Sequence, residues 1–540
     1  MKAKNIFRIF IYLLMGIMLV PLNSCKEEFF ELDSPPISEI KTVGDLELLI
    51  NYPYKNTFLS SNGSGEYVIS SMTHFVHLMM SDMVRVINVN SGFSTGQLYN
   101  RQTDQLVPQV TNTYANAYNT ISACNYIIDF IEKQPFPNAS AEQVTKNINR
   151  VKGEALFLRA FTYFYLAQLF CPPYDPSGSN DTETLVLRLK FADDLNTAMN
   201  NSPVPTSAIY AQIETDFKQA KELLPLEWAT GMPEAYKFGR ATRHAAMFYL
   251  ARTLLHKGNY TEALTELESI VNDPLKSRKL SANLVSLFEN NNVNGIGDPE
   301  VILYGFYGDP LRASLRHQVQ FHYFYNKTFS DPSLFRTPWV VSFDNSVLFK
   351  CKIMDRLDTD RQLTTEWTRD KRSKLYYSWK GADPSLSLKN PANKEYITGE
   401  AFVPYIGKKD AILMGDKYFR VPKYQNIPFV RSAEVYILIA AIKAYQNDGA
   451  GAAVSLNLVR KRSWDETLSG PFVPLASATF EDVDCEWIKE LAFESDRISF
   501  LQMFRKPIGP AERQTAPVEA PYPNFYWRLP LSETDFNSPK

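Results

Sequence analysis

The feature that most constrains this chain is a set of helical segments with small residues repeated along one face. Between Asn147 and Phe170, the residues Gly153, Ala160 and Ala167 recur every seven positions, so they lie along one side of a helix. Small side chains at such positions allow a neighbouring helix to approach closely. We therefore expect this segment, the strongest helix signal in the chain, to pack directly against another helix.

Further helical segments are predicted on both sides of an irregular middle. Residues 171–204 and 275–425 lack a helical period and are rich in Pro, Gly, Asn or Asp, so we expect loops there, with a few short helices and strands in the second region. Apolar periodicity and helix-breaking residues predict the other helices. They cover residues 43–52, 74–83, 113–133, 206–224, 242–257, 260–271, 431 to the turn at Gly449, 453–462 and 484–505.

Residues 242–271 follow the pattern of a tetratricopeptide repeat. An Ala-rich helix ends at Lys257, Gly258 and Asn259 form a turn, and Tyr260 and Ala263 open the return helix. In that repeat, small residues and an aromatic side chain interlock two antiparallel helices. Because a lone helical hairpin cannot bury its apolar face, we expect the helical pairs from both ends of the chain to form one core.

The first 25 residues carry an export signal. A basic start from Lys2 to Arg8 precedes an apolar run of about a dozen residues, shorter than the roughly 20 that a membrane-spanning helix needs. Residues 22–24 then lead into Cys25 in an order similar to the bacterial lipobox, where the cysteine thiol is acylated and becomes the new N-terminus. We expect residues 1–24 to be removed and Cys25 to carry lipid that holds the chain on a membrane.

Residues 26–40 form a tether with two adjacent prolines. Its first residues, Lys26, Glu27 and Glu28, look like the surface-export signal of some Gram-negative lipoproteins. The same residues also suit a plain solvated tether, and the sequence leaves both interpretations open.

Charge and cysteine content exclude several classes of protein. The formal net charge is −2 and becomes about −5 without the three basic residues of the signal, and no basic stretch stands out, so nucleic acid is not an expected partner. Cys124, Cys171, Cys351 and Cys485 are far apart and form no CxxC pair. We therefore expect buried thiols rather than a zinc site or a dense disulfide scaffold.

An aromatic stretch in the irregular middle is the first candidate for ligand binding. Between Val301 and Lys350, twelve of fifty residues are Phe, Tyr or Trp, about twice the chain average of 13%. Sugar rings have flat apolar C–H faces and a rim of hydroxyls, so aromatic stacking combined with hydrogen bonds suits them. Each of these side chains could instead pack a loop or the core. The candidates are Phe306, Tyr307, Tyr323, Tyr325 and Trp339.

The loops that follow the predicted helix 74–83 supply polar candidates. These are Asp82 and Arg85, with Tyr99 and Arg101 farther along. The alternative for Asp82 and Arg85 is a surface ion pair at three-residue helical spacing.

A histidine pair on that same helix raises the question of a metal. His74 and His77 have i, i+3 spacing, but no third ligand lies nearby in sequence, so we expect no metal site and no cofactor. Several charged residues beside apolar helix faces are expected to pair between helices instead of binding ligand. These are Glu154, Arg159, Glu434, Glu494 and Arg497.

A set of short blocks spread along the chain carries a family resemblance. The blocks are Cys25 with Phe29-Phe30-Glu31-Leu32-Asp33-Ser34-Pro35, Val151 to Tyr165, Ala241 to Ala246, Gly258-Asn259-Tyr260, Arg431 to Tyr436, Leu456 to Arg460, Glu490 to Glu494 with Arg497, and Trp527-Arg528-Leu529-Pro530 with Glu533 and Asn537. Together they resemble the SusD/RagB family of nutrient-binding outer-membrane lipoproteins. Each block is weakly specific alone, but they occur in the family's order, whereas residues 275–425 match poorly.

The resemblance implies an all-α fold of about four tetratricopeptide-like units that carry a large loop-rich region for ligand binding. It implies a non-enzymatic lid that captures an oligosaccharide, or in some members a peptide, and delivers it to a SusC-like TonB-dependent barrel in the outer membrane. Residues 41–540 would then be a single domain, with a helical scaffold at 110–272 and 430–506 and a variable region at 275–425. The alternatives are a surface hydrolase of glycans or peptides and a tetratricopeptide scaffold without a small ligand.

Overall fold

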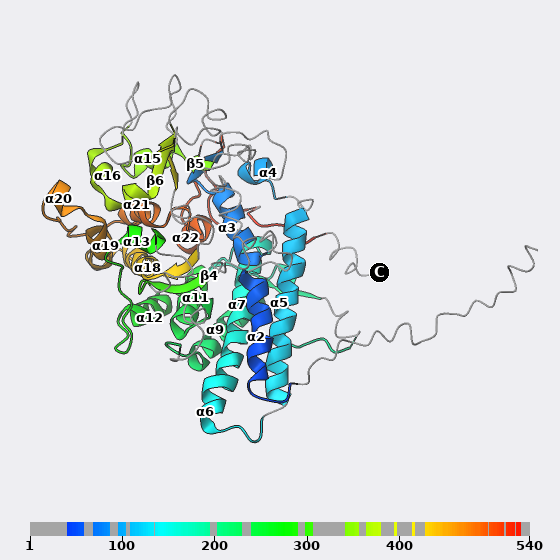
Figure 1. Cartoon of the computed structure of the whole chain (residues 1–540). Helices are drawn as coiled ribbons and strands as arrows, with labels where there is room; N and C mark the ends of the chain where they lie inside the picture. Colours follow the sequence, from blue (N-terminus) through cyan, green and yellow to red (C-terminus); the bar gives the residue numbers. More distant parts are fainter. Residues whose placement is uncertain are drawn as a thin grey trace, which may run out of the picture.

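Helices dominate the part of the chain that the structure describes, and the strands are short (Figure 1). The structure is a computed structural model. It describes residues 40–58, 68–86, 95–103, 108–133, 136–194, 202–228, 239–289, 298–305, 341–355, 363–379, 394–396, 413–415, 427–494, 496–511, 513, 515–523 and 525–530. The predicted signal segment 1–24, Cys25 and the tether up to residue 39 lie outside these ranges.

The first part of the scaffold consists of helices packed side by side. Helix α7 contacts α5 and α9, α11 contacts α9 and α12, and α2 covers α5 and α7. These helices are α2 (Asp45–Phe58), α3 (Ile69–Met80), α5 (Pro108–Lys133), α7 (Arg150–Phe170), α9 (Thr206–Leu223), α11 (Arg243–His256) and α12 (Tyr260–Val271), and a short α6 (Ala141–Gln143) with a π-helical turn (Val144–Asn149) leads into α7.

Helix α7 is the central element of this part, as its small-residue face predicts. All of its residues except Lys152 are buried. A Cβ atom added to Gly153 would lie 2.8 Å from the Cβ of Leu223 in α9, so a glycine at this position permits the close approach of the two helices.

The second part of the scaffold packs onto the first through α12. Helix α18 contacts α12, α19 and α21, so segments whose first residues, Tyr260 and Ser432, are 172 positions apart in the chain share one interface. A single hydrophobic cluster contains buried residues from both parts, which agrees with the expectation of one core. The elements of this part are β9 (Ile427–Arg431), α18 (Ser432–Tyr445), α19 (Gly449–Ser463), α20 (Glu466–Ser469), α21 (Phe480–Leu491) and α22 (Arg497–Met503).

Side-chain caps fix where several of these helices begin. The hydroxyl of Thr479 accepts from the backbone N–H of Asp482 at 3.2 Å, and the Asp482 carboxylate accepts from the N–H of Thr479 at 2.8 Å. Asp496 accepts from the N–H of Ser499 at 3.2 Å at the start of α22.

Several short elements, from the first part of the chain and from the region between the two parts, gather at one end of the molecule. Figure 1 shows α4, α15, α16, β5 and β6 at the top, whereas α6, α9 and α12 lie toward the bottom. Strand β1 pairs with β5, β4 with β9, and β6 with both β7 and β8, all antiparallel. The bounds are β1 (Val84–Val86), α4 (Thr95–Tyr99), α13 (Leu284–Glu289), β4 (Val301–Gly305), β5 (Val341–Phe343), α15 (Asn345–Lys350), α16 (Thr365–Arg369), a 3₁₀ turn (Lys371–Leu375), β6 (Tyr376–Trp379), β7 (Lys394–Tyr396) and β8 (Leu413–Gly415).

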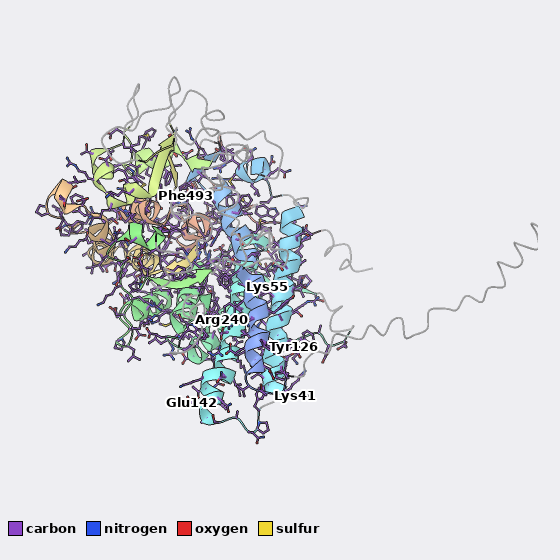
Figure 2. All side chains as sticks on the ribbon, in the orientation of Figure 1. Lys41, Lys55, Tyr126, Glu142, Arg240 and Phe493 are labelled. Atoms are coloured by element: carbon purple, nitrogen blue, oxygen red, sulfur yellow. A yellow bond between two sulfur atoms is a disulfide. The ribbon has the colours of Figure 1, made fainter. Side chains whose placement is uncertain are left out.

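Two predicted segments differ from the structure. The helix expected at 484–505 is two helices, α21 and α22, because Phe493 adopts a positive φ of 67° and Asp496 caps a new helix start (Figure 2). The loop expected at 171–204 contains strand β2 (Glu183–Val186), which pairs with β3 (Pro203–Pro205) in an antiparallel hairpin.

The expectation of four buried thiols is half wrong. Cys124 and Cys171 are buried free thiols, but Cys351 and Cys485 form a disulfide with Cα atoms 5.0 Å apart. The bond ties the end of α15 to α21, so it fastens the loop-rich region to the scaffold. Within the described ranges, we find no helix with the length and apolar character needed to cross a bilayer.

Candidate functional site

A two-stranded ribbon brings two of the predicted ligand-binding segments together. In the β1–β5 pair, Arg85 lies opposite Ser342 and Val84 lies opposite Phe343. The loop that contains Asp82 is therefore beside the strand that follows the aromatic stretch, and Trp339 is two residues before that strand. We call the ribbon together with Ser81–Met83 and helix α4 the ligand platform.

The aromatic candidates themselves lie outside the described residues. Phe306, Tyr307, Tyr323, Tyr325 and Trp339 all belong to residues 306–340, so their ligand contacts stay a prediction. The described chain fixes both ends of this segment. It leaves β4, which pairs with β9 of the scaffold, and returns at β5, which pairs with β1.

Asp82 holds the platform onto the scaffold. Its carboxylate accepts from Nε and Nη2 of Arg497 at 2.9 and 3.0 Å, and Arg497 also bonds Asp484. Burial alone would lower the pKa of Arg497, but the carboxylates of Asp484 and Asp82 raise it. The side chain of Asp82 is 14% exposed, so most of its acceptor capacity is directed into the protein.

Tyr99 and Arg101 are held by the C-terminal segment of the chain. The guanidinium of Arg513 donates to the carbonyls of Tyr99 and Ser81 and lies 4.1 Å from the centre of the Tyr99 ring. Arg101 donates to Met80 O at 2.9 Å and to Gly509 O. Burial, followed by the nearby Arg513, lowers the pKa of Arg101 to about 10.

These contacts are internal to the protein. Tyr99 is 6% exposed and Arg85 is 5% exposed, so both contribute to the packing of the platform. A direct role in ligand binding for Asp82, Arg85, Tyr99 or Arg101 stays a prediction.

A buried ionic network joins β9, α19 and α21, and the sequence indicates it only in part. Arg431 at the end of β9 donates to Glu300, Glu490 and Glu494, and Arg462 in α19 donates to Glu300 and Glu490. Burial opposes ionisation of Glu490, but the guanidiniums of Arg462, Arg431 and Arg372 hold its pKa well below the usual range. Of its members, only Glu494 is predicted from the sequence to form an ion pair.

Four of the five charged residues that were expected to form structural ion pairs do so, namely Glu154, Arg159, Glu494 and Arg497. Arg159 bonds Asp216 of α9 at 2.7 and 2.8 Å, and Glu154 accepts from Arg240 at 2.7 Å in the lower half of the molecule (Figure 2). Glu494 and Arg497 take part in the networks above.

The histidine pair of α3 is used within the core. His77 Nδ1 lies 2.6 Å from Asp496, and His74 Nε2 lies 3.2 Å from the hydroxyl of Tyr165. Burial lowers the pKa of His74 to about 4. Within the described ranges, no group of three or more His, Cys, Asp or Glu side chains is arranged to hold a metal ion.

A second buried cluster contains Ser, His and Asp side chains, the residue types of a hydrolase triad. His77 contacts Asp496, and Ser499 Oγ contacts His256 Nε2 at 2.8 Å and Arg252. These five residues are at most 3% exposed, so no substrate reaches them, and we assign them a packing role.

One motif was not foreseen. Residues 92–96 read Gly-Phe-Ser-Thr-Gly and match the GxSxG pattern of a nucleophile elbow. That pattern has its catalytic meaning on a strand–turn–helix of an α/β sheet. The described fold is helical with small antiparallel sheets, and Ser94 itself lies outside the described residues.

The surface of the described chain has two notable hollows. One, of about 380 Å³, is an apolar groove between α2 and α5 that includes Leu48, Tyr52 and Tyr126. The other, of about 420 Å³, lies at the ends of α11, α18 and α22 and contains Tyr174, Tyr260 and Tyr445.

Comparison with known sequences points to one family. The SusD-like family model described as "starch-binding associating with outer membrane" matches residues 32–255. A curated relative, the SusD-like protein P2 of Formosa agariphila, is 23% identical over 267 residues. This alignment covers 49% of the present chain and 46% of the relative, so the match spans somewhat less than half of that protein.

Solved structures match nearly the whole chain. A SusD-like carbohydrate binding protein from Bacteroides vulgatus has a TM-score of 0.66 at 17% identity, covering 92% of this chain and 96% of that one. A SusD superfamily protein from Bacteroides thetaiotaomicron has a TM-score of 0.62 at 18% identity, and the match covers 92% of this chain and 98% of that one. The chain is therefore similar to SusD-like proteins, in sequence over residues 32–255 and in fold over most of its length. Surface glycan-binding protein A from Bacteroides uniformis is also similar to this SusD-like chain, with a TM-score of 0.58 at 15% identity. The match covers 92% of this chain and 98% of that one.

These similarities confirm two expectations. The resemblance to SusD/RagB proteins holds, and the SusD-like fold confirms an all-α architecture of tetratricopeptide-like pairs with an irregular region between them.

Proposed function

We propose that this SusD-like chain is a non-enzymatic, lipid-anchored binding protein that captures an oligosaccharide at the cell surface. The observation that carries the proposal is the common fold with proteins described as carbohydrate-binding and surface glycan-binding, over 92% of the chain. Residues 306–340, which connect β4 to β5 in the sequence, are rich in aromatic side chains of the kind that stack on sugar rings. A peptide is the second class of ligand, and the binding assay below includes both.

Delivery to a SusC-like TonB-dependent barrel is part of the same proposal. A large nutrient cannot cross the outer membrane passively, so a surface binder needs an energised transporter beside it. Lipid on Cys25 would keep the binder at that transporter, and residues 26–40 would give it slack to move as a lid. Affinity capture of the chain from detergent-solubilised outer membranes should recover a large barrel protein, and its repeated absence contradicts this part.

The lipid anchor has its own test. Wild-type protein should incorporate labelled palmitate and sediment with outer membranes, whereas Cys25→Ala should do neither. A Cys25→Ala variant that stays on the cell surface contradicts the anchor.

The ligand-binding role of the aromatic stretch is tested by substitution. Tyr323→Ala and Trp339→Ala should each weaken glycan binding by roughly tenfold, since stacking with one aromatic contributes about 1 kcal/mol beyond the apolar area it buries. The matched control is Tyr52→Ala, because Tyr52 is an aromatic residue 52% exposed on α2, away from the ligand platform. Unchanged affinity in both Tyr323→Ala and Trp339→Ala would remove these residues from the site.

A further inference from the structure

The pocket at the ends of α11, α18 and α22 is lined by aromatic rings and, among the described residues, by one carboxylate, that of Asp175. Its volume is about 420 Å³, within the roughly 300–1,000 Å³ of small-molecule sites. The rings of Tyr174, Tyr260 and Tyr445 line it and are only partly buried. The rim comes from the loop after α7, and it includes Asp175 and Ser177.

The tyrosine rings are held in place by the scaffold. Tyr260 donates its hydroxyl to Met503 O at 3.0 Å, and its ring centre lies 4.9 Å from that of Tyr445. Tyr174 packs against Tyr210 with ring centres 5.0 Å apart. The aromatic wall of the pocket is therefore formed before a ligand arrives, which reduces the entropic cost of binding.

The two oxygens of the Asp175 carboxylate differ in their hydrogen bonding. Its Oδ1 accepts from the backbone N–H and the hydroxyl of Ser177, at 3.0 and 2.7 Å. Those two hydrogen bonds keep the pKa of Asp175 below its usual value, so the group is charged at neutral pH. Within the described part of the chain, Oδ2 makes no hydrogen bond, so it is available to a ligand hydroxyl.

Both terminal nitrogens of the Arg505 guanidinium bond backbone carbonyls, while its buried Nε has no hydrogen-bond partner among the described residues, and these bonds narrow the class of ligand. Arg505 donates to the carbonyls of Gln502 and His256 at 3.1 and 2.9 Å, and to that of Tyr174. Its guanidinium thereby satisfies carbonyls at the C-terminal ends of α11 and α22, where an anion would meet the negative end of each helix dipole. Lys506 Nζ lies 5.5 Å from the Tyr445 ring centre, so a cation already occupies one aromatic face.

A neutral polyhydroxylated ring meets these conditions better than an anion or an amine. We propose that this pocket is a second saccharide-binding site, which holds one sugar ring against the tyrosines with its hydroxyls on Asp175. The site lies on the helical scaffold and uses none of the residues of the ligand platform. It goes beyond the proposed function, and it stands whether or not the aromatic stretch binds glycan.

Saturation-transfer-difference NMR on the mature chain with Cys25→Ala tests the proposal, with methyl α-glucoside, maltose, cellobiose, laminaribiose and N-acetylglucosamine as probes. Asp175→Ala should weaken the binding of at least one probe by roughly tenfold, because a hydrogen bond to a charged group is lost. The matched control is Asp181→Ala, which removes an exposed carboxylate from the same loop outside the pocket and should bind as the parent does.

A second variant tests whether this site binds sugar independently of the ligand platform and the aromatic stretch. Tyr323→Ala combined with Trp339→Ala should leave the Asp175-dependent signal unchanged, even where it removes glycan binding elsewhere. Unfolding midpoints equal to that of the parent chain establish that the variants are folded. The proposal is overturned if no probe gives a signal, or if every probe binds Asp175→Ala as well as it binds Asp181→Ala.

Discussion

Asp82 and Arg497 lie 415 positions apart in the chain and form a two-point ion pair with N···O distances of 2.9 and 3.0 Å. Asp484 shares the same guanidinium, and Lys350 donates to Asp484 at 2.7 Å. One cluster thus joins the loop after α3, helix α15 and the helices α21 and α22. Through it, the scaffold positions the ligand platform.

Asp82→Asn should lower the free energy of unfolding by about 1–3 kcal/mol, because Arg497 is buried and loses one of its two carboxylates. Urea titration measures the loss. The control is Glu142→Gln, which breaks an ion pair whose side chains are 63% and 72% exposed and should cost less than about 1 kcal/mol. Equal effects of the two substitutions would contradict an anchoring role for Asp82.

The disulfide should contribute substantially to stability. Replacing both Cys351 and Cys485 with Ser is expected to cost about 2–4 kcal/mol, since the bond closes a long loop of the unfolded chain. Dithiothreitol should lower the melting temperature of the wild-type protein and leave that of the double variant unchanged. A reductant effect of the same size in both proteins would mean that the bond does not form in solution.

Gly153→Ala should destabilise the contact between α7 and α9. The new Cβ would lie 2.8 Å from Leu223 Cβ and 3.3 Å from its backbone carbon. Such overpacking costs about 1–3 kcal/mol, of which the better helix propensity of Ala offsets about 1 kcal/mol. Gly44→Ala is the control, because its nearest atom would be 3.5 Å away, and it should be nearly neutral in the same urea titration. A gain in stability from Gly153→Ala would contradict the close helix contact.

Mild acid should destabilise the fold through His74. Burial lowers its pKa to about 4, against 6.5 for an exposed histidine, while Asp496, Arg252 and His77 lie near it. The unfolded chain therefore takes up this proton at a higher pH than the folded protein. The stabilisation is complete above pH 6.5 and falls as the pH drops from 6.5 toward 4.

The effect is measured by the free energy of unfolding at pH 7 and at pH 5. Wild-type protein should lose about 2 kcal/mol more than His74→Gln across this interval, because the amide can bond Tyr165 but does not titrate. The same loss in both proteins would show that His74 does not titrate as its burial predicts.

Apolar periodicity and turn-forming residues predicted most helices of the scaffold. Helix α12 runs from Tyr260 to Val271 as expected, because Gly258, with a φ of 79°, forms the turn before it and Ala263 packs inward. In contrast, the apolar periodicity of 484–505 continues through Ile498 and Leu501, so nothing local marks the break at Phe493. That break follows from long-range contacts, including the bonds from Arg431 to Glu494.

The candidate site was predicted less completely, because its contacts are distant in sequence. The partners Asp82 and Arg497, and the 134-residue separation of Cys351 from Cys485, leave no trace in local spacing. The sequence did identify the two segments that the β1–β5 ribbon joins. It could not reveal that Tyr99 and Arg101 contact the C-terminal segment through Arg513 and Gly509.

The central claim, that this SusD-like chain binds a nutrient without transforming it, is tested by one measurement. The mature chain is titrated calorimetrically with a panel of oligosaccharides and peptides, and each mixture is then incubated and analysed for products by mass spectrometry. We expect saturable binding of at least one oligosaccharide with the ligand recovered intact. Turnover of the bound ligand, or no binding to any member of the panel, would contradict the account in favour of a hydrolase or a scaffold protein.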